Sequence, residues 1–192
     1  MRRRLWWVII AAIVVGAPIV WYLASPLFLN RVVSEGFPMS AGATVPEGMT
    51  QQQVEETMAA AAQTTTSASE AMPPAVSPAV AVARGSFTGA DGFHRGQGTA
   101  AVYRVGDQLV LRLEAFQVTN GPDLHVILTA HAAPKSRADV QQEYLEIAKL
   151  KGNVGEQNYT LPAGLSLDRY RTVVIYCKPF HVVFATAPLG AP

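Results

Sequence analysis

The chain is 192 residues long, which leaves room for one ordinary domain and additional segments. Only 15% of the residues are charged and the formal net charge is +1, so nothing favours binding to nucleic acid or another polyanion. Hydrophobic residues make up 49%, and much of that share lies in the first 30 residues.

The N-terminus predicts a membrane anchor. The cluster Arg2 to Arg4 precedes an uncharged run over residues 5–29, with Trp6 and Trp21 near its two ends. About 20 apolar residues span a bilayer as a helix, and aromatic rings favour its headgroup regions. Because the arginines should stay cytoplasmic, we predict a single-pass anchor over residues 1–33, in the cell membrane, with the rest of the chain extracytoplasmic.

The alternative interpretation of this run is a cleaved signal peptide, for which Ala24 and Ser25 offer small residues at a cleavage site. The apolar core of a signal peptide is usually about 7–15 residues long. The run is longer than that, so the anchor is the preferred interpretation.

Residues 34–83 predict a flexible tether. This stretch carries five Glu, no Lys or Arg, and many Ala, Thr, Ser, Gln and Pro. Thr50 and Gln53 fit a capping box, so a short helix is expected over residues 51–63. That helix is interpreted either as a fraying part of the tether, which we prefer, or as a docking helix for a membrane partner.

Residues 84–192 predict an all-β domain, an antiparallel β-sandwich or a barrel-like fold. Leu109, Leu111 and Leu113 recur with the period of two that marks a half-buried strand, and Gly106 with Asp107 predicts a hairpin turn before them. Strands are expected over residues 99–105, 108–116, 124–129, 144–150, 157–161, 172–177 and 182–185.

This part of the chain resembles the DM-thirteen domain family, a module described as an electron-transfer domain. The resemblance rests on motifs in the right order: Gly85-Ser-Phe87, His94, Asn120-Gly-Pro-Asp-Leu124, Leu150-Lys-Gly152, Gly155-Glu-Gln-Asn-Tyr159 and Val173-Val-Ile-Tyr-Cys177. It implies a β-sandwich-like fold and a redox role centred on one cysteine. In animal members the module occurs beside domains linked to membrane cytochromes, which implies a membrane or exported redox protein as partner.

Cys177 is the residue on which a redox role would depend, since it is the only cysteine in the chain. An unpaired cysteine in an exported protein suggests a reactive thiol or an intermolecular bridge. However, Cys177 shares strand parity with Val173 and Ile175, and free cysteine is among the most buried residue types. A buried core thiol is therefore the competing interpretation.

Two histidines are candidates for tuning the thiol or binding a ligand. His181 follows Cys177 by four residues across Pro179, so a turn would bring the two side chains together as a coupled pair near the surface. A copper site of the cupredoxin type needs a second imidazole, which His125 would supply. Copper and heme are both candidate cofactors, although each histidine is more simply interpreted as a surface or rim residue.

Two functions remain open. One is a membrane-tethered extracytoplasmic domain with a redox or electron-transfer role that uses Cys177. The other is a non-catalytic binding module for a ligand or protein, with Cys177 as a structural core residue. Neither is expected to be a stand-alone enzyme, since the sequence carries no nucleophile elbow, P-loop or zinc-binding helix motif.

Overall fold

The computed structural model describes residues 2–25, 29–39, 50, 52–53, 56–57, 60 and 79–192. The elements are α1 (Arg2–Ala24), β1 (Val32–Ser34), β2 (Val80–Ser86), β3 (Thr88–Gly89), β4 (Gly96–Val105), β5 (Gln108–Val118), β6 (Leu124–Thr129), α3 (Arg137–Gln141), β7 (Tyr144–Lys149), β8 (Val154–Thr160), β9 (Thr172–Cys177) and β10 (Val182–Pro188).

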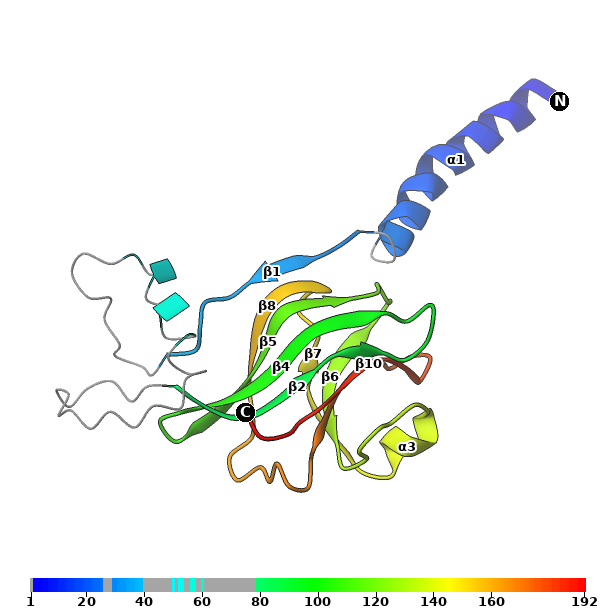
Figure 1. Ribbon diagram of the computed structural model, residues 1–192. Helices are drawn as coiled ribbons and strands as arrows, with labels where there is room; N and C mark the ends of the chain where they lie inside the picture. Colours follow the sequence, from blue (N-terminus) through cyan, green and yellow to red (C-terminus); the bar gives the residue numbers. More distant parts are fainter. Residues whose placement is uncertain are drawn as a thin grey trace, which may run out of the picture.

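Two sheets face each other as a sandwich (Figure 1). Sheet A has the strand order β1-β8-β5-β4-β2, and sheet B has the order β3-β10-β9-β6-β7. Neighbouring strands are antiparallel except β1 and β8, which are parallel. The predicted all-β sandwich is therefore confirmed, and the barrel-like alternative is not what the sheets form.

The core between the sheets follows from the alternation in β5. Leu111 and Leu113 are fully buried in the main apolar cluster, whereas Arg112 and Glu114 point to the outer face of sheet A. The link from β4 to β5 turns at Gly106, whose φ of 59° is readily adopted by a residue without a Cβ. This is the hairpin predicted from the sequence.

The central strands of sheet B, β6 and β9, are buried on both faces, which agrees with their mostly apolar sequences. Leu124 and Val126 point into the inter-sheet core, while Ile127 packs on the outer face against Val140 of α3. The helix is short and begins with a capping box between Ser136 and Asp139.

The N-terminal boundary of the folded unit differs from the sequence prediction. Residues 32–37 lie on sheet A, where β1 pairs with β8 and Phe37 is buried beside Tyr103. The boundary expected at Arg84 falls inside β2, which already begins at Val80. The segment expected to be a tether thus supplies strand residues at both of its ends. The sequence did not predict these strands, because they contain few large apolar side chains.

The predicted capping box is present. Thr50 N donates to Gln53 Oε1 at 2.9 Å, and Gln53 N donates to Thr50 Oγ1 at 3.3 Å. The rest of the helix predicted over residues 51–63 lies partly outside the described residues, as does most of the Pro-rich stretch that follows it.

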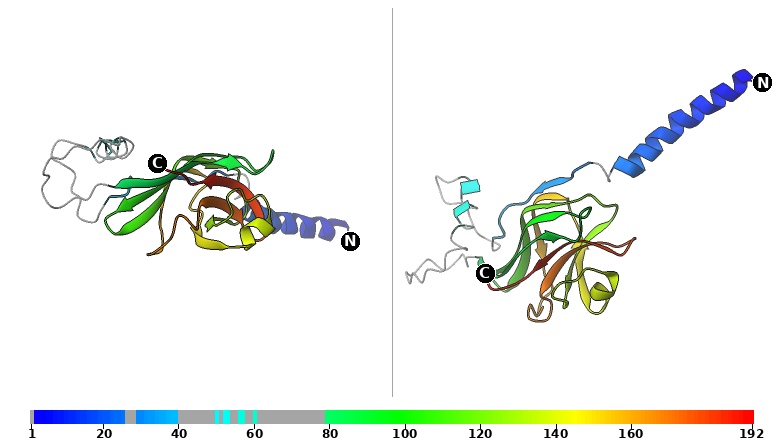
Figure 2. Two further views of the ribbon diagram at one scale, coloured as in Figure 1. Left: turned by 60° about the horizontal axis from the view of Figure 1, so that its bottom comes forward. Right: turned by 45° about the vertical axis from the view of Figure 1, so that its right-hand side comes forward.

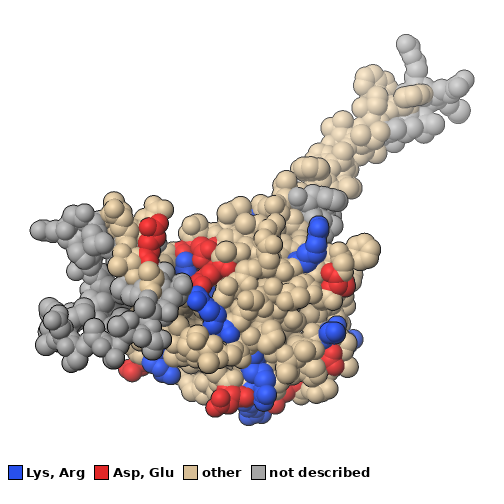
Figure 3. Space-filling view, in the orientation of Figure 1, with Lys and Arg blue, Asp and Glu red and all other residues tan. Residues whose placement is uncertain are grey.

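Helix α1 leads away from the sandwich in all views (Figures 1 and 2). It continues through Pro18. Among the residues that the structure describes, no helix is both long and apolar enough to cross a membrane. The described side chains of α1 are uncharged, in contrast to the interspersed acidic and basic groups on the visible face of the sandwich (Figure 3).

Candidate functional site

The Cys177 thiol lies in the core between the two sheets. Cys177 is the last residue of β9, pairs with Leu124 of β6 and Val182 of β10, and is 1% exposed. Its side chain belongs to the inter-sheet cluster that also contains Ile175 and Phe184. In such surroundings a free cysteine behaves as a small apolar residue, so a reagent reaches the thiol only when the structure opens.

The predicted pair of Cys177 and His181 does not form near the surface. Tyr176 precedes Cys177 and therefore points to the opposite, outer face of sheet B. The Nδ1 atom of His181 lies 3.2 Å from the hydroxyl oxygen of that tyrosine. His181 has a φ of 55°, which turns the chain so that the imidazole covers the outer face. The sheet thus separates the imidazole from the thiol.

His125 also lies on the outer face of sheet B, where it is 9% exposed and not at the rim as expected. Its Nδ1 is 2.8 Å from Glu146 Oε1, and its Nε2 is 3.2 Å from Asp123 Oδ1. The Nδ1 atom is buried and makes no hydrogen bond of good geometry within the described part of the chain, so the ring contacts the two carboxylates through close N···O approaches. Lys149 and Lys178 complete the charge cluster, at 2.7 Å from Asp123 and 2.9 Å from Glu146.

The cluster favours the ionised carboxylates. The hydrogen bond from Lys149 holds the pKa of Asp123 below its ordinary value, with a further contribution from His125. The hydrogen bond from Lys178 likewise lowers the pKa of Glu146. The two carboxylates contact His125 of β6, Lys149 of β7 and Lys178 in the turn after β9, so the cluster joins the central strands of sheet B to its edge.

The candidate donors do not fit the candidate cofactors. Copper of the cupredoxin type needs a thiolate and two imidazoles around one point, but Cys177 lies on the inner face of sheet B and both His125 and His181 on its outer face. Within the described part of the chain, no group of three His, Cys, Asp or Glu side chains is arranged to hold a metal ion. Heme ligation by Cys177 needs an open cavity, and the thiol is enclosed by packed side chains.

A cleft of about 670 Å³ lies where the chain leaves α1 and enters the sandwich. Two of the segments that resemble the family line it, residues 120–122 with Leu124, and residues 150–152. Two amide side chains of the domain hold the incoming chain: Asn120 and Asn153 donate to Asn30 Oδ1 at 3.2 Å and 2.9 Å. Asn120 of the first family-like segment and Asn153, which directly follows the second, therefore position the N-terminal segment against the domain.

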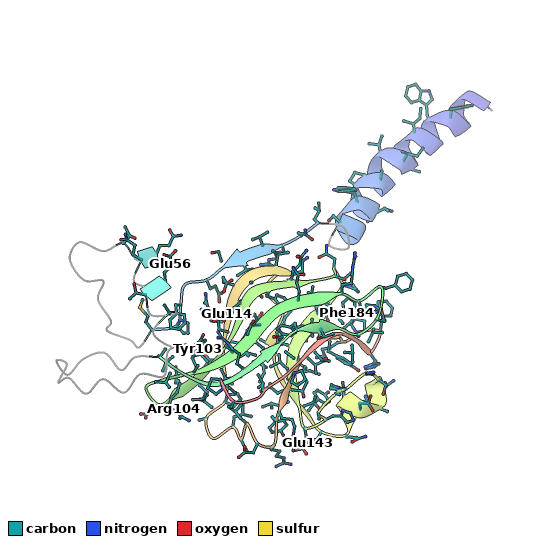
Figure 4. All side chains as sticks on the ribbon, viewed as in Figure 1. Glu56, Tyr103, Arg104, Glu114, Glu143 and Phe184 are labelled. Atoms are coloured by element: carbon teal, nitrogen blue, oxygen red, sulfur yellow. The ribbon has the colours of Figure 1, made fainter. Side chains whose placement is uncertain are left out.

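A second polar cluster, which the sequence did not reveal, occupies the outer face of sheet A. Tyr103 and Glu114 point toward one another from β4 and β5 (Figure 4), with the hydroxyl donating to the carboxylate at 2.7 Å. Arg84 pairs with Glu114 at 2.6 Å, and Arg112 pairs with Glu156 at 3.0 Å. Burial and the neighbouring Glu114 raise the pKa of Tyr103 far above its ordinary value.

A comparison with known families matches residues 87–189 to a family model described as "Electron transfer DM13". The match covers β3 to β10, including Cys177, His125 and His181, and leaves out α1, β1 and β2. It spans more than half of the chain and confirms the resemblance inferred from the motifs. No curated protein and no solved structure matches.

Proposed function

Because the chain belongs to the electron transfer DM13 family, we propose that it is a membrane-tethered, extracytoplasmic accessory domain for electron transfer. The observation that carries this proposal is the family match, which spans the sandwich from β3 to β10. The partner would be another membrane or exported redox protein, since a lone thiol needs an external group with which to exchange electrons.

Membrane tethering is supported by the exposed apolar side chains of α1. Trp6 is 66% exposed and Val15 is 63% exposed, and because they are nine positions apart they lie on opposite sides of the helix. A helix with apolar side chains on opposite sides is stable where apolar surroundings cover it. Residues 5–29 carry no charge and follow three arginines, which favours a cytoplasmic N-terminus.

The tethering test uses the full chain with a reporter fused after Pro192. We expect the chain to stay in the membrane fraction after carbonate washing and the reporter to be active only outside the cytoplasm. Recovery of a mature form lacking residues 1–24 in the soluble exported fraction would instead identify a cleaved signal peptide.

We further propose Cys177 as the redox group, reached through the end of β9. Support comes from its being the only cysteine in the chain and from its place at the last residue of that strand, directly before the turn over residues 178–181. Lys178, Pro179 and Phe180 in this turn are all exposed, Phe180 at 68%, so the turn adds few side chains to the core. Oxidation by a partner disulfide would place the Cys177 thiolate in a mixed disulfide and release the partner's second sulfur as a thiolate.

The second candidate function is a non-catalytic binding module in which Cys177 only fills the core. The 1% exposure of Cys177 and its place in the apolar cluster between the sheets favour this candidate. The two functions differ in how the thiol becomes accessible.

The discriminating measurement compares the rate of thiol labelling with the rate of global unfolding in the same buffer. The redox proposal expects labelling that is faster than unfolding, because local opening at the β9 end suffices. Two results together would support the binding module instead. Cys177 would be labelled only at the rate of global unfolding, and a small-molecule disulfide would form no mixed disulfide with it.

A further inference from the structure

A segment from outside the family-matched region lies along the edge of sheet A. This segment, residues 31–37, is called the strap below. Its strand β1 pairs in parallel with β8, with Val32 opposite Val154 and Ser34 opposite Glu156. The pairing extends beyond the strand, because the backbone nitrogen of Glu35 donates to the carbonyl of Glu156 at 3.0 Å. The strap thus adds a strand to an edge that the rest of the domain leaves unpaired.

Charged and polar groups of the domain converge on Glu35. Its carboxylate accepts hydrogen bonds from Lys151 Nζ at 2.7 and 2.9 Å and from the backbone nitrogen of Asn158 at 2.7 Å. Arg112, whose side chain is 9% exposed, donates to the carbonyl oxygens of Glu35 at 3.1 Å and Gly36 at 2.9 Å. Hydrogen bonds between ionised groups and backbone are among the stronger ones in proteins.

An aromatic side chain ends the strap. Phe37 is 5% exposed and packs edge-on against Tyr103, with ring centroids 4.9 Å apart. The guanidinium of Arg112 lies 5.6 Å from the centre of the Phe37 ring. A buried aromatic ring beside an arginine is a typical anchor of a peptide interface.

Two glycines of the domain leave room for the strap backbone, because they have no Cβ atom. A Cβ at Gly152 would overlap the carbonyl oxygen of Arg31, and a Cβ at Gly155 would overlap that of Val33. The three atoms nearest to each of these Cβ positions all belong to the strap. Glycine at such positions allows a second backbone to approach closely.

We propose that this edge of sheet A is a peptide-docking groove and that the strap is its exchangeable occupant in cis. The groove takes an extended peptide with a carboxylate followed two residues later by an aromatic ring, as Glu35 and Phe37 provide. Strand addition supplies the affinity through the backbone, and the side-chain contacts supply the specificity. The groove residues Tyr103, Arg112 and Asn158 lie within the family match, whereas the strap lies outside it.

Docking of the strap sets the distance between α1 and the domain. With the strap docked, the two are joined only by residues 25–31, which span at most about 25 Å when fully extended. With the strap released, the connection extends to β2, which begins at Val80. Docking and release of the strap therefore control how far the domain can move from α1. This inference does not depend on the chemistry of Cys177.

The test cuts the folded full chain and asks whether the strap stays bound. A site-specific protease sequence is inserted after Thr66, an affinity tag is placed at the N-terminus, and the purified chain is cleaved in detergent micelles. We expect the C-terminal fragment to remain on the tagged fragment at micromolar concentration. An excess of a synthetic peptide of residues 29–39 should release it, and the released fragment should still show a cooperative thermal transition.

Single substitutions on both sides of the groove sharpen this test. Phe37→Ala should speed release at least about tenfold, since loss of a buried aromatic anchor is typically among the largest losses at an interface. Gly152→Ala, on the groove side, should speed it as well. The matched controls are Val32→Thr, at a side chain that is 68% exposed, and Gly92→Ala, where a Cβ meets open space. Both controls should leave the release rate unchanged.

Three outcomes would overturn the proposal. Immediate loss of the C-terminal fragment from the wild-type chain would show that the groove does not hold the strap. Release at the wild-type rate in both Phe37→Ala and Gly152→Ala would show that the contacts described above do not determine binding. A fragment that excess peptide cannot release, or that unfolds on release, would make the strap a permanent strand of the fold.

Discussion

At the scale of single residues, the packing around Cys177 predicts a cost for a polar replacement. Cys177→Ser places a hydroxyl in the apolar cluster between the sheets, and a buried polar group without a partner costs about 1–3 kcal/mol. Cys177→Ala should lower the free energy of unfolding by about 1 kcal/mol, because it removes one group of about the size of a methylene. Urea unfolding of the two variants measures the difference. A serine variant as stable as wild type would mean that the thiol has polar surroundings.

Asp91 gives a second prediction at this scale. Its carboxylate lies 2.7 Å from His94 Nδ1 and accepts backbone hydrogen bonds from Phe93 and His94. The side-chain hydrogen bond to His94, followed by these backbone bonds, lowers the pKa of Asp91 to about 2. The loop over residues 90–95 should therefore keep this stabilisation above about pH 4 and lose it as the pH falls towards 2.

Carboxyl titration by NMR measures this pKa directly. The variant His94→Gln should bring the pKa of Asp91 back towards its ordinary value of 3.8. A wild-type Asp91 that already titrates near that value would contradict the predicted hydrogen bonds.

At the scale of elements, the docked strap should be sensitive to acid. Burial alone would raise the pKa of Glu35, but the hydrogen bonds from Lys151 and Asn158 outweigh it and the pKa is lowered. The carboxylate therefore stabilises docking fully above its ordinary pKa, and this contribution is lost as the pH falls through the lowered pKa. The basic side chains that face the carboxylate are those of Lys151 and Arg112.

The resonances of the Phe37 ring report docking, because the ring lies against Tyr103. We expect the docked population to fall with decreasing pH in the wild type and to be lower but flat with pH in Glu35→Gln. The same pH dependence in both proteins would assign the effect to another group.

At the scale of the whole molecule, the sandwich should fold without the strap. Residues 79–192 contain both sheets except β1, and they include the entire family match. We expect a cooperative thermal transition for residues 79–192, at a temperature at least about 4 °C below that of residues 29–192, which corresponds to roughly 1 kcal/mol for a domain of this size. A transition that is lost altogether would make β1 essential to the fold.

Local sequence determined most of the β domain. The strands over residues 124–129 and 172–177 were predicted with the bounds that the structure has, because apolar runs and turn residues act over a few positions. The family followed from motifs, which are also local. The inward direction of Cys177 followed from strand parity with Val173 and Ile175, although the sequence left its exposure open.

Only the tertiary structure decided which side chains meet. The sequence placed His181 close to Cys177, but the sheet separates them because neighbouring residues of a strand point to opposite faces. Glu35 was assigned to the tether, and its partner Lys151 lies 116 positions away in the sequence. No local pattern records such pairs, since their contact depends on the order of strands in the sheet. That order is set by burying both sheets at once, which is a property of the whole chain.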